Sequence, residues 1–163
     1  MRKILLFPLA LYIISCNSHK SCKDFHFIIK SGKDKYISKT QTFIKDMVSP
    51  GPDSLYTFKI GLDSTKLKKI QAGVDEINLW NYSDNYSVTT DGSGTQVFIS
   101  PCFSYSIEIF CGNNSKKITW DNCHGIPEGK EFEKLQRLFD SILETIMNTP
   151  EYKASPEIKS FYL

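Results

Sequence analysis

The chain has 163 residues, with 20 lysines and arginines against 18 aspartates and glutamates, a formal net charge of +2. Arg2 and Lys3 are the only charged residues in the first fifteen, so the remaining 148 residues (163 minus 15) hold 18 cations (20 minus 2) and 18 anions. A neutral chain without a basic cluster argues against a nucleic-acid-binding protein. This length suffices for one domain with a hydrophobic core, and no repeat or low-complexity tract indicates a second.

The first fifteen residues have the pattern of an export signal. Arg2 and Lys3 precede an uncharged apolar run at residues 4–14. As a helix this run would be about 16 Å long, roughly half of the ~30 Å hydrocarbon core of a bilayer. Pro8 inside the run also disfavours a permanent membrane helix. We therefore predict that residues 1–15 are a cleaved signal peptide.

The run ends in Ile13-Ile14-Ser15-Cys16, which resembles the lipobox of bacterial lipoproteins. In that family the leader is cleaved before the cysteine, which then carries diacylglycerol and usually an acylated amino terminus, with fatty acids such as palmitate. The resemblance implies that Cys16 is the lipidated residue, and several acyl chains make such an anchor effectively permanent. Ile14 departs from the commoner pattern, in which a smaller residue precedes the serine. The alternative is an ordinary secretory signal with an incidental cysteine.

The residue after the cysteine bears on the location. In the lipoprotein family an aspartate there favours the inner membrane, whereas this chain has Asn17. The resemblance therefore implies the outer membrane if the cell is Gram-negative, with the periplasmic and the surface face both open. The richness in Lys, Ile, Asn and Tyr is similar to that of small lipoproteins of Bacteroidota. We expect a lipidated tether at residues 16–23 and a single globular domain at residues 24–163.

The first half of the domain is predicted to form three strands and a helix. Aromatic and branched residues favour strands at residues 25–30 and 55–60, and more weakly at residues 35–48. Asp63 is a candidate helix cap. Apolar residues then follow at helical spacing, namely Leu67, Ile70, Val74 and Ile77. Gly73 weakens this helix by about 1 kcal/mol without overturning the prediction.

A polar, turn-rich loop at residues 79–94 follows this helix and contains three aromatic residues. Loops carry a large share of binding residues, so Trp80, Tyr82 and Tyr86 are candidate ligand-binding residues. The alternative for each of them is packing into the core.

Three strands are predicted next, at residues 95–100, 105–111 and 116–121. A turn at residues 112–115 pairs Cys111 with Lys116, which sets Ile109 opposite Ile118 and Ile107 opposite Trp120. This register makes one face of the hairpin apolar and the other mostly polar, as a half-buried sheet requires. Phe110, beside Lys117 on the polar face, is the exception.

The strongest helix is predicted at residues 130–148. It has a wide apolar face made by Phe132, Leu135, Leu138, Phe139, Ile142, Leu143 and Ile146. Pro150 ends it. The fold class is therefore expected to be α+β: an antiparallel sheet of five to six strands packed with two helices. The expected order is β-β-β-α-β-β-β-α.

Four cysteines remain after Cys16, and an even number in an exported chain indicates disulfides. In the predicted register Cys123 falls opposite Ser104, so Cys102 is its diagonal neighbour on the same face. Cys111 lies at the far end of the hairpin. We expect a Cys102–Cys123 disulfide, and a Cys22–Cys111 disulfide that ties the tether to the sheet.

No motif predicts catalysis, a metal or a cofactor. The three histidines lack the spacing of a closed metal site, and Cys123-His124 alone does not make one. Ser104, Asp121 and His124 lie near one another in the predicted register, but no nucleophile elbow accompanies them. The residues 91–94 (DGSG) lack the alternating carboxylates of a calcium loop.

The sequence therefore predicts a membrane-anchored envelope lipoprotein that is a non-catalytic binding or structural module. Its expected partners are the bilayer, through acylated Cys16, and an envelope protein or a glycan. Two alternatives are an inhibitor of a secreted enzyme, acting through residues 101–104, and an envelope hydrolase whose site carries no recognisable motif.

Overall fold

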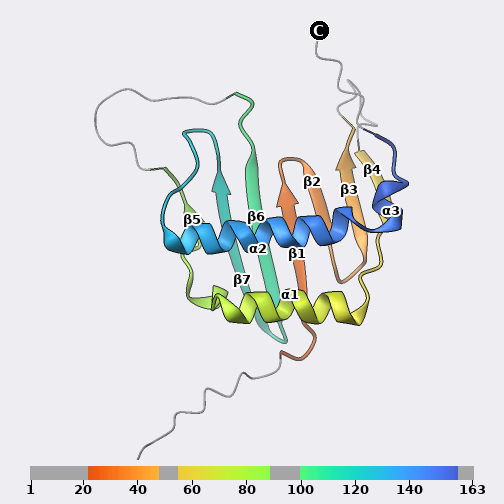
Figure 1. Cartoon of the computed structure of the whole chain (residues 1–163), viewed down its shortest axis with the longest axis horizontal. Coiled ribbons are helices and arrows are strands. Elements are labelled where there is room, and N and C mark those ends of the chain that lie inside the picture. The colour runs from red at the N-terminus through yellow and green to blue at the C-terminus, as the bar shows by residue number, and fades with distance from the viewer. Residues whose placement is uncertain (1–21, 48–54, 89–99, 158–163) are drawn as a thin grey trace, which may run out of the picture.

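The computed structural model describes residues 22–47, 55–88 and 100–157. Within these ranges one seven-stranded mixed sheet has the order β4-β3-β2-β1-β6-β7-β5 (Figure 1). The strands are β1 (His26–Ser31), β2 (Asp34–Ile37), β3 (Thr42–Asp46), β4 (Leu55–Lys59), β5 (Asn85–Tyr86), β6 (Ser104–Cys111) and β7 (Asn114–Asp121). The helices are α1 (Ser64–Glu76), α2 (Lys130–Met147), the short α3 (Pro150–Lys153) and the 3-10 turn η1 (Leu79–Asn81).

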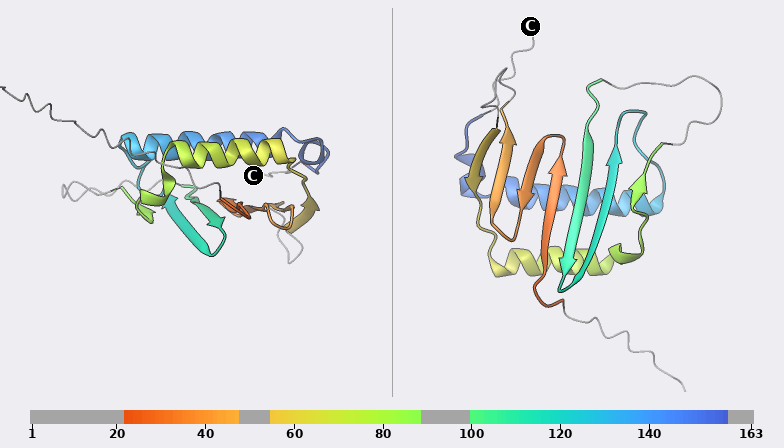
Figure 2. Two further views of the ribbon diagram at one scale, coloured as in Figure 1. Left: turned by 90° about the horizontal axis from the view of Figure 1, so that it is seen from below. Right: turned by 180° about the vertical axis from the view of Figure 1, so that it is seen from behind.

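Both long helices lie on the same face of the sheet. Seen edge-on, α1 and α2 run side by side in one layer and the strands form a second layer (Figure 2, left). No helix or strand of the described ranges covers the other face (Figure 2, right). The fold class is α+β, as the sequence predicts.

Strand alternation decides which side chains face the helices. Neighbouring residues of a strand point to opposite faces, so one alternate set becomes core. The helix-facing core residues of the sheet are Phe27, Ile29, Tyr36, Phe43, Ile107, Ile109, Ile118 and Trp120. The remaining alternate residues face away from the helices.

The helix α2 covers the sheet with the apolar face that its sequence predicts. Its buried residues recur at helical spacing and are Phe132, Leu135, Phe139, Ile142 and Ile146. The ring of Phe139 stands edge-on to that of Trp120 at 4.8 Å between centroids, and the ring of Tyr105 lies 5.9 Å from Phe139. This aromatic cluster joins α2 to the β6–β7 hairpin.

The helix α1 begins at the predicted cap, because the Asp63 carboxylate accepts the Lys66 N–H at 2.8 Å. Ile70 and Val74 are its buried residues. A Cβ at Gly73 would lie 2.9 Å from Cδ1 of Leu138 in α2. Gly73 therefore permits the close approach of the two helices. The sequence alone indicates only the cost of this glycine to helix stability and does not predict this packing role.

The structure corrects the predicted number and direction of strands. The weak strand at residues 35–48 is two strands, β2 and β3, which turn at Ser38–Gln41. Residues 85–86, predicted as loop, form β5, which pairs with β7 in parallel, so the sheet is mixed and not antiparallel. A third helix, α3, begins at Pro150. The predicted strand at residues 95–100 lies outside the described residues except for Ser100, which is not in a strand.

The hairpin register differs from the predicted one by two residues. Cys111 pairs with Asn114, so Ile107 lies opposite Ile118 and Tyr105 opposite Trp120. The loop holds only two residues, with Gly112 at φ 57° in its first position, where a type II′ turn places glycine. A shift of two residues keeps every side chain on its predicted face, because strand alternation has period two.

Phe139 provides a direct test of this core. We expect Phe139→Ala to lower the free energy of unfolding by about 3–5 kcal/mol, because it removes a fully buried ring and leaves a cavity. Urea unfolding followed by circular dichroism measures the change. The matched control, Glu144→Ala on the exposed side of the same helix, should change it by at most about 0.5 kcal/mol. Similar losses in both variants would contradict the placement of α2.

Candidate binding surface

No described helix or strand covers the face of the sheet turned away from the helices. We call it the open face and define it by the outward side chains of five strands. They are His26, Ile28, Lys30, Lys35, Ile37, Thr42, Ile44, Asp46, Ser104, Ser106, Glu108, Phe110, Ser115, Lys117, Thr119 and Asp121. The adjacent Asn85 of β5 pairs with Thr119. These side chains form one continuous surface, since they project from neighbouring strands of one sheet.

An apolar stripe crosses the centre of the open face. The rings of His26 and Phe110 stack with centroids 4.5 Å apart and planes 5° from parallel. Ile28 comes next on β1 and lies directly opposite Ile37 on β2. Ile44 on β3 is diagonal to Ile37 and extends the stripe. All five side chains are partly exposed, so water wets apolar surface here.

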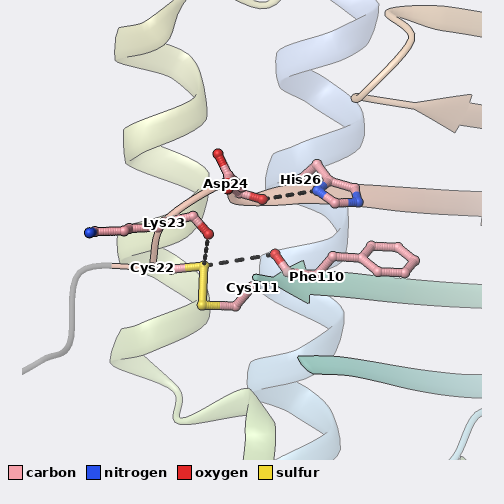
Figure 3. Close-up of a disulfide and its surroundings, with 6 residues drawn as sticks. All are labelled: Cys22, Lys23, Asp24, His26, Phe110 and Cys111. Carbon is pink, nitrogen blue, oxygen red and sulfur yellow. Dashed lines mark hydrogen bonds between the residues drawn. A yellow bond between two sulfur atoms is a disulfide. The ribbon is translucent and has the colours of Figure 1, made fainter. Parts of the chain in front are cut away.

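The His26 ring has a fixed orientation in this stripe. Its Nδ1 lies 2.9 Å from the carbonyl oxygen of Asp24, so Nδ1 carries the proton and donates to that oxygen (Figure 3). This hydrogen bond positions the ring against Phe110. The imidazole therefore contributes a rigid flat surface to the stripe.

Charged and polar side chains border the stripe. Lys30 lies directly opposite Lys35, and Glu108 lies opposite Lys117. Like charges opposed across two strands repel each other. The Lys30–Lys35 pair therefore creates a local positive potential, and the packing of the sheet does not require this pair. Neither lysine forms an ion pair with a residue of the described ranges.

A shallow hollow of about 240 Å³ lies at the β6–β7 side of the open face. Its polar lining consists of Lys30, Asn85, Ser104, Ser106, Lys117, Thr119 and Asp121. The Thr119 hydroxyl lies 3.0 Å from the Asn85 side-chain oxygen and donates to it, which ties β5 to β7. Tyr105 and Trp120 complete the lining, and the open hollow suits a group of a larger partner better than a buried small ligand.

The three loop aromatics predicted to bind a ligand contribute mainly to packing. Tyr82 is only 6% exposed and belongs to the core, and Trp80 packs against that core. The ring of Tyr86 lies 5.4 Å from Phe132, and its hydroxyl donates to the Glu131 carboxylate. Burial, and then this hydrogen bond, raise the pKa of Tyr86. The packing alternative thus describes Tyr82 fully and the other two in large part.

Both expected cysteine pairs are joined in the structure. Cys102 and Cys123 have Cα atoms 4.7 Å apart, and Cys22 and Cys111 have Cα atoms 5.3 Å apart, within the usual range for disulfides. The two bonds lie at opposite ends of the β6–β7 hairpin. Figure 3 shows Cys22 against the last residue of β6. The Cys22 Sγ also lies 3.8 Å from the Phe110 carbonyl oxygen, a contact without a donated hydrogen because a disulfide sulfur carries none.

Of the serine, aspartate and histidine weighed as a hydrolytic site, the structure brings Ser104 and Asp121 together. Ser104 and Asp121 lie directly opposite each other and both line the polar hollow. The hollow is not lined by His124, and the Asp121 carboxylate accepts the Cys123 N–H at 3.0 Å. Within the described part of the chain, no group of three or more His, Cys, Asp or Glu side chains could hold a metal ion.

Residues 101–104, considered from the sequence as an inhibitory segment, are hydrogen-bonded to the residues that follow β7. The Phe103 N–H donates to the Asn122 side-chain oxygen at 2.7 Å, and the Asn122 N–H donates to the Phe103 carbonyl at 3.2 Å. These bonds continue the β6–β7 ladder past the strand ends. Phe103 is 42% exposed, yet its backbone is not free to adapt to an enzyme cleft.

A cluster of ionisable side chains lies under the C-terminal segment, away from the open face. The Lys45 amine is buried, donates to Ser155 Oγ at 3.1 Å and to the Pro156 carbonyl at 2.8 Å, and lies 5.0 Å from the centroid of the Tyr152 ring. The Asp34 carboxylate accepts the Asp46 N–H at 2.8 Å. Burial raises the pKa of Asp34, although this hydrogen bond and Lys45 act in the opposite direction. These contacts attach the C-terminal segment to β2 and β3.

A groove of about 530 Å³ lies between α1 and α2. Its rim carries Lys69, Glu76, Lys134 and Arg137 around Leu138 and Ile142. Arg137 also pairs with Glu133 one helical turn away. The groove follows from the spacing of two packed helices, and no convergent set of polar groups lies in it.

The chain was compared with family models, with curated proteins and with solved structures, and none of the three comparisons finds a match. The functional argument therefore depends on the residues themselves.

The open face was not predicted as a binding surface from the sequence, although two features of the sequence indicated it. The β1 segment FHFIIK is apolar at consecutive positions, so it places apolar side chains on both faces of the sheet. Phe110 was an exception on the polar face of the hairpin, and the structure shows it stacked on His26. An apolar residue on an expected solvent face marks a candidate interface.

The role of Tyr82 can be tested by truncation. We expect Tyr82→Ala to lower the free energy of unfolding by about 3 kcal/mol or more, because it empties a core position. Thermal and urea unfolding measure this loss. Tyr82→Phe keeps the ring and should fold nearly as stably. A stable Tyr82→Ala variant would restore the ligand-binding interpretation of this residue.

The Asp34 environment predicts a pH dependence with a definite sign. Because the folded-state pKa is raised, the folded protein binds more protons than the unfolded chain between the ordinary value of 3.8 and the raised value, so stability falls as pH rises through this window. Asp34→Asn keeps an oxygen acceptor for the Asp46 N–H without ionising. We expect the stability of this variant relative to wild type to increase from pH 3 to pH 7. A constant difference, or one of opposite sign, would contradict the assigned cause.

Proposed function

We propose that this chain is an exported, lipid-anchored envelope protein without catalytic activity that binds another protein through the open face. The observation that carries the proposal is the apolar stripe with its charged border. A partly exposed apolar centre surrounded by polar and charged side chains is the usual composition of a protein–protein interface. The shallow, open hollow on this face also suits a protein more than an enclosed small molecule.

The export part of the proposal draws its support from two independent features. One is the leader that ends in Ile13-Ile14-Ser15-Cys16, with Cys16 as the acylated residue. The other is the pair of disulfides, since disulfides persist in oxidising compartments such as the bacterial envelope. Asn17 favours the outer membrane by resemblance to lipoproteins. No described helix is long and apolar enough to cross a bilayer.

The charges of the open face indicate what the partner carries. On this face Lys30 and Lys35 are opposed to each other without an ion pair to a described residue, whereas Lys117 lies opposite Glu108. A partner with an apolar patch flanked by carboxylates would contact the stripe and neutralise the opposed lysines. Such complementarity favours rapid and specific association.

Site-specific photo-crosslinking in the producing cells tests the proposal. A photoreactive residue placed at Lys117, on the open face, should give a discrete crosslinked product with one protein. The matched control places the same residue at Lys134, an exposed lysine on α2, and should give none. Lys117 is exposed, so neither change should disturb folding.

Three outcomes of this experiment are informative. Loss of the Lys117 product on Ile37→Glu, with Tm unchanged, would support the apolar stripe as the contact. A product from Lys134 alone would transfer the interface to the helices. A product removed by glycan-degrading enzymes but not by protease would replace the protein partner with a glycan.

A further inference from the structure

We infer that the Cys22–Cys111 disulfide orients the domain on the membrane, with the Cys22 end of the sheet against the bilayer and the Ser104 end away from it. This inference rests on the proposed acylation of Cys16. It adds a second interaction surface, whose partner is the anionic bilayer surface itself.

The argument starts from the length of chain between the lipid and the disulfide. Cys16 and Cys22 are six residues apart, and an extended chain spans at most about 3.3–3.6 Å per residue, so this tether reaches roughly 20 Å. The disulfide joins Cys22 to Cys111, at the last position of β6. The end of the sheet that holds Cys111 therefore stays within this distance of the membrane surface.

The opposite end of the sheet lies farther away than the tether reaches. The strand β6 runs from Ser104 to Cys111, and its eight residues span about 23 Å at roughly 3.3 Å per step. For the Ser104 end to contact the bilayer with the strands upright, Cys22 would have to lie at least that far above the surface. The tether is too short, so the inverted orientation is excluded.

The disulfide is what keeps the tether shorter than the strand β6. Without it, the first firm attachment would be the start of β1 at His26, ten residues from Cys16, which corresponds to roughly 35 Å of extended chain. That reach exceeds the length of β6 and would permit either end to face the membrane. A single backbone bond, from the Gly112 N–H to the Lys23 carbonyl at 3.1 Å, also holds this segment, but it is not covalent.

The charges at the two ends agree with this orientation. Lys23, Lys39 and Lys59 lie at the Cys22 end, and none of them forms an ion pair with a described residue. Lys39 lies in the turn between β2 and β3, and Lys59 donates to the Thr40 carbonyl and to the Thr42 hydroxyl of that region.

Of the acids in this region, Asp24 is next to Lys23 in the chain, and the carboxylates of Asp63 and Asp84 are already paired with Lys66 and Lys116. The unpaired lysines therefore present positive charge to anionic headgroups, which attract basic residues close to the surface. Toward the Ser104 end, Lys33 pairs with Asp46 and Asp121 is acidic, while Lys30 and Lys35 project from the open face, perpendicular to the sheet. This difference favours an upright domain over one lying on its side.

An upright domain has a consequence for the proposed partner. The strands then run along the membrane normal, and the open face stands perpendicular to the bilayer (Figure 2, right). A partner would approach the stripe laterally, from the same membrane, with the Ser104 end and the Cys102–Cys123 disulfide farthest from the lipid.

The test uses the full acylated protein, isotope-labelled, in nanodiscs of phosphatidylglycerol that contain a gadolinium-chelating lipid. Paramagnetic broadening of amide signals reports distance from the bilayer. Amides of Lys39, Gly112 and Asn113 should broaden at least about tenfold more than those of Gly32 and Ser104, because the strands hold these two sets about 20 Å apart. Uniform broadening, or the reverse gradient, would overturn the inference.

Two variants separate the disulfide from other causes. Cys22→Ser with Cys111→Ser should flatten the gradient, whereas Cys102→Ser with Cys123→Ser, at the far end of the hairpin, should leave it intact. Should the first variant fail to fold, ten glycine and serine residues inserted after Ser18 lengthen the tether and retain the disulfide. This insertion should flatten the gradient too, and an unchanged gradient would remove the tether from the explanation.

Failure of the proposed acylation gives a different result from failure of the orientation. A protein without lipid would not be recovered with the nanodiscs at all. Recovery without a gradient would leave the anchor in place and reject the orientation alone. Nanodiscs of phosphatidylcholine, which has no net charge, test the contribution of the lysines to the orientation. The broadening gradient should weaken in these nanodiscs if attraction to anionic headgroups contributes.

Discussion

The packing of α1 against α2 on one face of the sheet is the constraint on which the rest of the structure depends. Gly73 lets Leu138 approach the first helix, and the two helices together cover the apolar side chains of the central strands. Because both helices lie on this face, the described elements leave the other face uncovered (Figure 2, left). The apolar stripe on that face is therefore a product of the same arrangement that builds the core.

The β6–β7 hairpin connects the core to the open face and to both disulfides. Trp120 and Tyr105 pack against Phe139 on one side of it, and Ser106, Glu108 and Lys117 project from the other side. Its ends carry the two disulfides, one of which leads to the proposed lipid anchor. A single element thus joins the core and the open face to the proposed anchor, and under that proposal the position of the open face relative to the membrane is defined.

Local patterns predicted most of the elements correctly. The apolar spacing in α2, the Asp63 cap of α1 and the alternation in the hairpin are signals within one element, and the structure contains all three. The two-residue error in the hairpin register arose because the turn contains Gly112 and Asn113 alone, and either register keeps the faces. The cysteine pairs agree with the expectation, since the faces and ends that determined them did not change.

What the sequence left open depended on contacts between distant segments. The parallel strand β5 is two residues long and is defined by its pairing with β7. A strand this short has no apolar periodicity from which it could be predicted. The tyrosines of its segment resembled a binding loop, whereas Tyr82 is buried by the packed helices and sheet. The placement of both helices on one face is equally non-local. For this reason the candidate surface moved from the loop to the open face.

The account depends most on export, because the anchor, the disulfides and the orientation all require it. The intact mass of the protein extracted without reductant from membranes of the producing cells tests this directly. We expect a chain that begins at Cys16, carries acyl groups, and gains four hydrogens on reduction, two for each of the two disulfides. A chain that retains residues 1–15 and has free thiols, with no change of mass on reduction, would contradict the account.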